Sequence, residues 1–266
     1  MWEPFTATGK LSVSSATGPI ALIAAHPDDE ILALGGQLAG IACLSLIHVT
    51  DGAPRDPSDA RRAGMRSRSA YALTRARELD RALEAAQVTG ARRRALGTPD
   101  QEAIEHLPAL TAALEEELRG AAAVITHPYE GGHPDHDACA LAVQCACERL
   151  SRTARAAPVR LEFASYHARG GQQVTGLFWP AADCPESAIA LGERQLARKR
   201  AALARFATQK DVIAAFPLSP ERLRPAPRYD FTRPPPPGEV LYDRFRWRIT
   251  GESWRRRAAA ALEGMQ

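Results

Sequence analysis

The sequence predicts an α/β protein with a doubly wound, mostly parallel Rossmann-like sheet flanked by helices. Short apolar runs that suit buried parallel strands alternate with longer segments of helical periodicity, and this alternation is typical of such a sheet. An apolar content of 45% over 266 residues is enough for one large domain. Because no G-x-G-x-x-G fingerprint follows the first predicted strand, a nucleotide-binding oxidoreductase is disfavoured.

The predicted elements alternate regularly over the first part of the chain. Pro27 suits the first position of a helix, where its missing N–H costs nothing. The charges of the long segment 58–87 surround an apolar stripe, which indicates an amphipathic helix. Strands are expected at 19–25, 43–49, 93–96, 121–126 and 159–167, and helices from 27 and over 58–87, 107–118 and 136–150.

From about residue 170 the pattern diverges, and we expect a C-terminal extension of strands and helices. The expected elements are a strand at 174–179, a helix at 186–207, a proline-rich loop at 217–238, an edge strand at 241–249 and a helix at 252–262. In the edge strand, arginines alternate with apolar residues, which favours a solvated edge over a grip on an anionic substrate. We predict an N-terminal arm at 1–18 and a single domain over 19–266.

Composition and charge exclude several classes of function. The net charge of +3 is spread along the chain, whereas a nucleic-acid binder shows a dense basic face. No apolar run approaches the roughly 20 residues of a transmembrane helix, and the first residues lack the pattern of a signal peptide. The five cysteines form no C-x-x-C pair, so we expect small buried residues of a reduced, cytoplasmic protein. The oligomeric state stays open, a homo-oligomer included.

Two similar polar blocks each follow a predicted strand. The first is Ala25-His26-Pro27-Asp28-Asp29-Glu30, and the second contains His133-Pro134-Asp135-His136. One helical turn places His26 and Asp29 on the same side, and open α/β sheets bind ligands at the carboxyl ends of their strands. A single block of this kind is usually a helix start with carboxylates in its first turn. Two such blocks instead indicate a metal-dependent hydrolase.

The ligand chemistry of the two blocks suits zinc. A catalytic zinc typically takes three ligands from His, Asp or Glu and leaves one position open. Spacing alone does not separate ligands from supporting residues. The candidates are His26, Asp28, Asp29, His133, Asp135 and His136.

The two blocks resemble the PIG-L/LmbE-like family of zinc-dependent N-deacetylases. Thr50-Asp51-Gly52, Arg75-x-x-Glu78 and Leu96-Gly97-x-x-Asp100 also agree with the family pattern. The resemblance covers residues 19 to 140 well and the remainder only in outline. Some relatives place a tyrosine two residues before the histidine that corresponds to His133, whereas this chain has Gly131 there.

The resemblance implies a role for each residue of the two blocks. It implies that His26, Asp29 and His136 bind Zn²⁺. Asp28 would then be the general base that deprotonates the attacking water, and His133 would stabilise the oxyanion as an imidazolium. Asp135 would hold a histidine in its correct tautomer. Two histidines and one carboxylate also accept Fe²⁺, Co²⁺ or Mn²⁺.

The resemblance also implies a reaction, the removal of an N-acetyl group from an N-acetylglucosamine-like sugar or sugar conjugate. The alternatives are an amidase that cleaves a larger acyl group or a thiol-sugar conjugate, and a non-catalytic carbohydrate-binding relative. Arg75, Asp100, Tyr129 and His167 are candidate substrate contacts. Arg75 could equally pair with Glu78, and Asp100 could cap a helix.

Overall fold

A mostly parallel sheet forms the centre of the computed structural model, which describes residues 18–153, 157–236, 238–245 and 247–265. Within these residues the strand order is β3-β2-β1-β4-β5-β9-β8. The first five of these strands are parallel to their neighbours, and β9 and β8 extend the sheet in antiparallel pairing. The strands are β1 (Ile20–Ala24), β2 (Leu44–Pro54), β3 (Arg92–Asp100), β4 (Ala123–Thr126), β5 (Val159–Phe163), β8 (Ser187–Ile189) and β9 (Glu221–Pro225). The predicted doubly wound α/β fold is confirmed.

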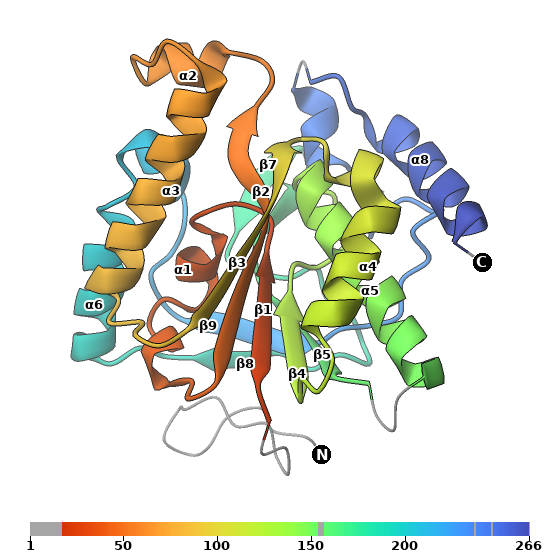
Figure 1. Cartoon of the computed structure of the whole chain (residues 1–266), viewed down its shortest axis with the longest axis horizontal. Coiled ribbons are helices and arrows are strands. Elements are labelled where there is room, and N and C mark those ends of the chain that lie inside the picture. Colours follow the sequence, from red (N-terminus) through yellow and green to blue (C-terminus); the bar gives the residue numbers. More distant parts are fainter. Residues whose placement is uncertain (1–17, 154–156, 237, 246, 266) are drawn as a thin grey trace.

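Helices cover both faces of this sheet (Figure 1). One face carries α1 (Asp29–Leu34), α3 (Arg68–Ala85) and α6 (Glu193–Leu203), and the other carries α4 (Leu107–Glu117), α5 (Pro134–Thr153) and α8 (Gly251–Gly264). Successive strand residues point to opposite faces of the sheet. Leu22 therefore packs with residues of α1, α3 and α6, and Ile23 packs with residues of α4, α5 and α8. Burial on both faces explains why these strands read as continuous apolar runs.

Shorter elements lie outside the main sheet and its long flanking helices. A two-stranded hairpin, β6 (Tyr166–Arg169) and β7 (Gln172–Thr175), lies outside the main sheet. The remaining short helices are α2 (Ser58–Arg62), α7 (Lys210–Ile213), η1 (Leu38–Gly40), η2 (Ala103–His106), η3 (Ala207–Gln209) and η4 (Leu241–Arg244).

The predicted single helix over 58–87 is wrong, because the chain forms two helices there. Helix α2 ends at Arg62, and Gly64 follows in a left-handed conformation, with a φ of 72°. Ser67 then begins α3 by accepting a hydrogen bond from the N–H of Ala70 at 3.1 Å. A serine cap satisfies one of the free N–H groups of a first turn, so it starts a new helix rather than continuing an old one.

Several predictions for the C-terminal part need correction. The edge strand expected at 241–249 is wrong, because Leu241–Arg244 is a 3₁₀ helix whose first N–H donates to the carbonyl of Gly131 at 2.8 Å. The segment therefore folds over the loop that precedes α5 instead of pairing with the sheet. The expected helix at 186–207 begins only at Glu193, after strand β8. The expected strand at 159–167 is divided into β5 and β6, and the one expected at 174–179 ends at 175, with β7.

A buried ion pair ties α6 to the sheet. Lys199 on α6 is 1% exposed, and its Nζ donates to Glu221 Oε1 at 2.9 Å and to the carbonyl of Leu32 at 2.8 Å. The same carboxylate oxygen accepts the N–H of Gly36 at 2.8 Å. Burial lowers the pKa of Lys199 and raises that of Glu221, and each charge opposes the shift of the other. Removing either partner would therefore leave the other without the charge that offsets its burial.

We expect Lys199→Met to lower the free energy of unfolding by about 3–5 kcal/mol, because it leaves Glu221 as an unpaired buried charge. Urea unfolding followed by circular dichroism measures the effect. Arg222→Met is the matched control. Arg222 lies next to Glu221 on β9, and its substitution breaks a partly exposed ion pair with Glu186. The control substitution should lower the free energy of unfolding by about 1 kcal/mol or less. Equal losses in the two variants would contradict a structural role for the buried pair.

The cysteines are free thiols, and four of them are buried: Cys139, Cys145, Cys147 and Cys184. Cys43 is exposed, which corrects the prediction that all five are buried. No described helix combines the length and the apolar character needed to cross a membrane. The N-terminal arm predicted at 1–18 lies almost wholly outside the described residues.

Candidate metal centre

The predicted site residues meet at the carboxyl edge of the parallel strands. The turn after β1, the end of β3 and the start of α5 converge there, because parallel strands bring their carboxyl ends to the same edge. A cavity of about 420 Å³ opens at this edge. Its lining includes His26, Asp28, Asp29, Arg75, Asp100, His133 and His136. Asp135 lies behind His26, at the base of α5.

Nitrogens of three histidines, His26, His127 and His136, lie within 3.5 Å of the Asp29 carboxylate oxygens. His26 Nδ1 lies 3.3 Å from Asp29 Oδ2, and His136 Nε2 lies 3.5 Å from Asp29 Oδ1. His136 Nε2 is buried and has no hydrogen-bond partner among the described residues. A buried nitrogen without a partner is costly unless it binds something. Two nitrogens and a carboxylate are a donor set that suits a divalent metal. The groups whose donor atoms lie within 4.8 Å of one another join His136 to His26 and His133, or to Asp29 and His127.

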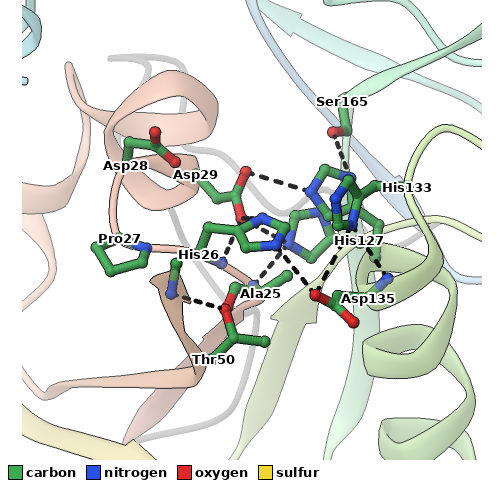
Figure 2. A network of polar contacts seen from close by, with 12 residues as sticks. Ala25, His26, Pro27, Asp28, Asp29, Thr50, His127, His133, Asp135 and Ser165 are labelled. Carbon is green, nitrogen blue, oxygen red and sulfur yellow. Dashed lines mark hydrogen bonds and ion pairs between the residues drawn. The ribbon is translucent and has the colours of Figure 1, made fainter. Parts of the chain in front are cut away.

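The opposite nitrogens of these two rings have partners that set the tautomers. His26 Nε2 lies 3.2 Å from Asp100 Oδ1 and 3.2 Å from Asp135 Oδ2, and His136 Nδ1 lies 3.2 Å from Ser165 Oγ. A proton on each of these nitrogens leaves the lone pairs of His26 Nδ1 and His136 Nε2 free to face Asp29. Figure 2 shows Asp135 and Ser165 on opposite sides of the histidine group. The arrangement fits a metal that is held by these two nitrogens and Asp29.

Asp135 is itself held by the backbone. Its carboxylate accepts hydrogen bonds from the N–H of Gln101 at 2.6 Å and of Ala103 at 3.0 Å. These bonds connect the start of α5 to the segment that follows β3. The resemblance implied that Asp135 orients a histidine, and the structure places its carboxylate against His26.

Two further histidines lie close enough to take part in alternative metal groups. His127 and His133 each belong to a set of donor atoms within 4.8 Å of one another. His127 Nε2 accepts the N–H of Ala25 at 3.0 Å. His133 Nδ1 accepts the N–H of Asp135 at 3.2 Å. These bonds occupy one lone pair of each ring, whereas the free lone pairs of His26 and His136 face Asp29.

His133 differs from its predicted protonation state. Burial and the neighbouring His26 lower the pKa of His133 well below its ordinary value. Because Nδ1 accepts a backbone N–H, the single proton of a neutral ring is on Nε2, which lies 3.6 Å from Asp100 Oδ1. The lowered pKa and the bond to Nδ1 favour a neutral imidazole, whereas the resemblance implied an imidazolium. This ring can still donate one hydrogen bond into the cavity.

Arg75 holds the carboxylate of Asp28, the candidate general base. Arg75 is 3% exposed, and its guanidinium donates to the carbonyls of Gly52 and Pro27 and to Asp28 Oδ2, at 3.0, 3.0 and 3.1 Å. The alternative pairing of Arg75 with Glu78 is wrong, since Glu78 instead accepts the N–H and hydroxyl of Thr208. Burial raises the pKa of Asp28 to about 8, although Arg75 opposes the shift.

Asp28 also has an unusual backbone conformation. Its φ is 153° and its ψ is −26°, a combination that costs energy for residues with a side chain. The N–H of Asp28 donates to Glu30 Oε2 at 3.2 Å, and the same oxygen lies 3.0 Å from His48 Nε2. The N–H of His26 donates to Asp29 Oδ2 at 2.7 Å. These contacts hold the turn after β1 in the conformation that aims Asp28 and Asp29 in different directions (Figure 2).

Two of the predicted substrate contacts lie outside the cavity. Tyr129 is buried, its hydroxyl donates to the carbonyl of Arg233 at 2.7 Å, and its ring stacks on Trp254. His167 is fully buried, 3.3 Å from Glu130. Because neither side chain lines the cavity, the direct contacts predicted for both are corrected to positions in the protein interior.

Two aromatic side chains of the site were missed in the sequence. Trp247 lies edge-on to His133, with ring centroids 4.9 Å apart, and Tyr166 lies edge-on to His136 at 5.1 Å. Both line the cavity. The apolar residues alternating with arginine at 241–249 were the available signal for Trp247, but that pattern was interpreted as an edge strand. Tyr166 lies within a predicted strand and carried no signal of its own.

We expect Asp100→Asn to weaken zinc binding by about 10- to 100-fold, because a carboxylate behind a ligating histidine fixes its tautomer and orientation. Competition with a chromophoric chelator measures the affinity. Asp211→Asn is the control, since Asp211 lines the same cavity from α7 and should leave the affinity within about twofold of wild type. Unchanged affinity in Asp100→Asn would contradict the orienting role and favour the predicted contact with a sugar hydroxyl.

The fold and the site together define an α/β protein with a candidate metal centre at the carboxyl edge of its sheet. Comparison with protein families finds a match in the first part of the chain. Residues 21–147 match the PIG-L family model, described as GlcNAc-PI de-N-acetylase. The family resemblance of the two blocks is thereby confirmed. A search of curated proteins finds no significant match to the chain.

Solved structures of similar fold include two deacetylases and a hydratase. A deacetylase of the teicoplanin biosynthesis pathway is 15% identical, with a TM-score of 0.61 over 80% of this chain and 99% of that one. The A40926 pseudoaglycone deacetylase Dbv21 is 19% identical, with a TM-score of 0.60 over 81% and 99%. GalB, the 4-carboxy-2-hydroxymuconate hydratase from Pseudomonas putida, is 16% identical, with a TM-score of 0.54 over 80% and 98%. At these identities the similarity shows the fold.

Proposed function

We propose that this chain is a zinc-dependent deacetylase that removes the N-acetyl group of an N-acetylated sugar or sugar conjugate. The products are acetate and a free amine. The observation that carries the proposal is the pair of histidine nitrogens turned toward Asp29, with the Asp28 carboxylate on the adjacent residue. The family description, GlcNAc-PI de-N-acetylase, supports the reaction, and the antibiotic deacetylases of the same fold support a conjugated substrate.

His26, Asp29 and His136 are the proposed metal ligands. When bound, zinc would polarise the acetyl carbonyl and lower the pKa of water from about 15.7 to about 7. Fe²⁺, Co²⁺ and Mn²⁺ suit the same two-histidine, one-carboxylate set, and zinc is the metal we propose.

Asp28 is the proposed general base. Its carboxylate lines the cavity and is fixed on one side by Arg75, so its other oxygen is available to accept a proton from the attacking water. Its pKa of about 8 lies near neutrality, where a carboxylate both takes and returns a proton. A cation on the adjacent Asp29 would lower this pKa again and favour the basic form. Asp28 can then return the proton to the leaving amine.

His133 is the proposed donor to the developing oxyanion. Its Nε2–H faces the cavity beside Asp100, and a neutral N–H that is fixed before the reaction needs no reorganisation as charge develops. The edge-on contact with Trp247 and the bond from the Asp135 N–H to Nδ1 hold the ring in place. Arg75 contacts the general base rather than the open cavity, so we propose a positioning role for it instead of a substrate contact.

Other features support a cytoplasmic setting and leave the acyl group open. Four buried free thiols and one exposed thiol suit a reducing compartment, and we propose the cytoplasm.

The same proposed metal ligands would serve an amidase that cleaves a larger acyl group. The size of the pocket around the acyl group decides between the two reactions, and part of the cavity wall comes from the divergent C-terminal part.

Acetate release tests the proposed reaction. The purified protein is given N-acetylglucosamine, N,N'-diacetylchitobiose and N-acetylglucosamine conjugates, with and without a chelator. We expect acetate from at least one of them, loss of release with chelator, and recovery on addition of zinc. Metal-dependent release of a longer acid from N-acyl analogues, without acetate, would favour the amidase. Release that chelators leave unchanged would contradict the proposal.

A further inference from the structure

A second, larger cavity adjoins the candidate metal centre. Its volume is about 810 Å³, against about 420 Å³ for the cavity that holds the histidines. Asp59, Asp100, Gln101, Phe245 and Trp247 line both cavities, so the two are neighbours. Pockets for whole small ligands range over about 300–1,000 Å³, and each of the two cavities lies within that range. The chemistry at Asp28 and Asp29 does not use this space.

The charges around the second cavity are balanced. Its described lining contains five arginines and five carboxylates. Three of the arginines are paired with lining carboxylates: Arg55 with Glu102, Arg62 with Asp59, and Arg257 with Glu105. A site for phosphate or another anion needs an excess of positive charge. Paired arginines and carboxylates instead offer many donors and acceptors to a neutral, hydroxyl-rich ligand.

An aromatic pair, the exposed Phe245 and the partly buried Trp247, lines both cavities. The rings of Phe245 and Trp247 are 4.8 Å apart and tilted by 35°, and Phe245 is 42% exposed. Large exposed apolar side chains in an otherwise polar wall indicate a binding surface. The face of a pyranose ring is made of C–H groups, which pack on the electron-rich face of an aromatic ring, while its hydroxyls point outward toward polar partners.

The surrounding chain holds this pair in position. Tyr242 donates its hydroxyl to Asp137 Oδ2 at 3.1 Å, and the N–H of Gly251 donates to Asp243 Oδ1 at 2.6 Å. Ile249 is buried in the core beneath α8. These anchors tie the aromatic pair to α5, the helix that also carries His136. The pair therefore has a fixed position relative to the candidate metal centre.

We propose that Phe245 and Trp247, with the adjoining cavity, form a subsite for a second, neutral sugar ring of the substrate. The inference rests on the proposed function in placing the acetylated ring at the metal centre, and it adds that the preferred substrate is an uncharged oligosaccharide or glycoside. The second ring stacks on the aromatic pair, and its hydroxyls reach the arginine and carboxylate pairs.

Binding of sugars that lack an acetyl group tests the subsite apart from catalysis. Cellobiose, glucose and glucose 1-phosphate are titrated into the zinc-loaded protein and followed by saturation-transfer NMR. We expect cellobiose to bind about tenfold more tightly than glucose, and Trp247→Ala and Phe245→Ala each to weaken cellobiose binding by about five- to tenfold. Glucose 1-phosphate should bind no better than glucose.

Leu73→Ala is the matched control, since Leu73 is 52% exposed on α3 and lines neither cavity. This variant should bind cellobiose as wild type does. No binding of cellobiose to wild type, or equal binding by wild type and both aromatic variants, would overturn the subsite. Tighter binding of glucose 1-phosphate than of cellobiose would overturn its neutral character. Because none of these sugars is hydrolysed, failure of acetate release would count against the proposed function and not against the subsite.

Discussion

Asp28→Asn should lower kcat by about 10²- to 10⁴-fold while zinc stays bound, because the amide cannot accept the proton of the attacking water. The substitution keeps the shape of the side chain. Arg75 keeps its bonds to the carbonyls of Gly52 and Pro27, so the turn after β1 retains its anchor. The proposed metal ligands are other residues. Steady-state acetate release and zinc content, measured on the same preparation, test the prediction.

The matched control for this substitution is Asp51→Asn. Asp51 lies in β2 near the same edge of the sheet and pairs with Arg68, away from the histidines. Its loss should change kcat by less than about threefold, since it touches none of the proposed catalytic groups. Turnover near the wild-type rate by Asp28→Asn with zinc bound would contradict the general-base role. Loss of zinc from this variant would instead indicate that Asp28 is a ligand.

His136→Gln should remove most of the bound zinc and lower activity by about 10³-fold or more, because one of three protein ligands is lost. The side-chain amide is a weaker donor than the imidazole, and the contact to Ser165 Oγ no longer sets a tautomer. Metal analysis after dialysis, together with acetate release at saturating zinc, measures both effects. Partial rescue of activity by excess zinc is expected.

His106→Gln controls for the loss of a histidine as such. His106 is exposed on η2, outside both cavities, and its replacement should leave zinc content and activity unchanged. If His136→Gln kept wild-type zinc content, His136 would not be a ligand. In that case the group of His26, Asp100, His133 and Asp135 would be the next candidate to test.

The parallel half of the fold was predictable because it depends on local patterns. The runs at β1 and β4 are buried on both faces, so their composition alone indicates parallel strands. The two histidine blocks follow these strands, and the parallel pairing of β1 with β4 brings them to the same edge. The side chains of the two blocks therefore lie together at the edge where the sequence predicted them.

The C-terminal part could not be predicted, because its structure depends on contacts between distant residues. The chain at 241–249 has the alternation of a strand, yet it is held by the loop at Gly131 and by Asp137 on α5. No local pattern indicates such partners. The environment of Asp100 was hidden for the same reason, since its neighbour His26 is 74 residues away in sequence. The neutral state of His133 depends on burial and on a backbone N–H, which spacing does not reveal.

Metal content is the most direct test of the central claim, that two histidines and one aspartate at this edge hold a catalytic metal. The protein is purified, stripped with chelator, loaded with zinc and dialysed, and its zinc is measured by mass spectrometry. We predict close to one zinc per chain in wild type, and less than about a tenth of that in His136→Gln. Wild-type protein that binds no zinc after loading would contradict the metal centre and the function proposed from it.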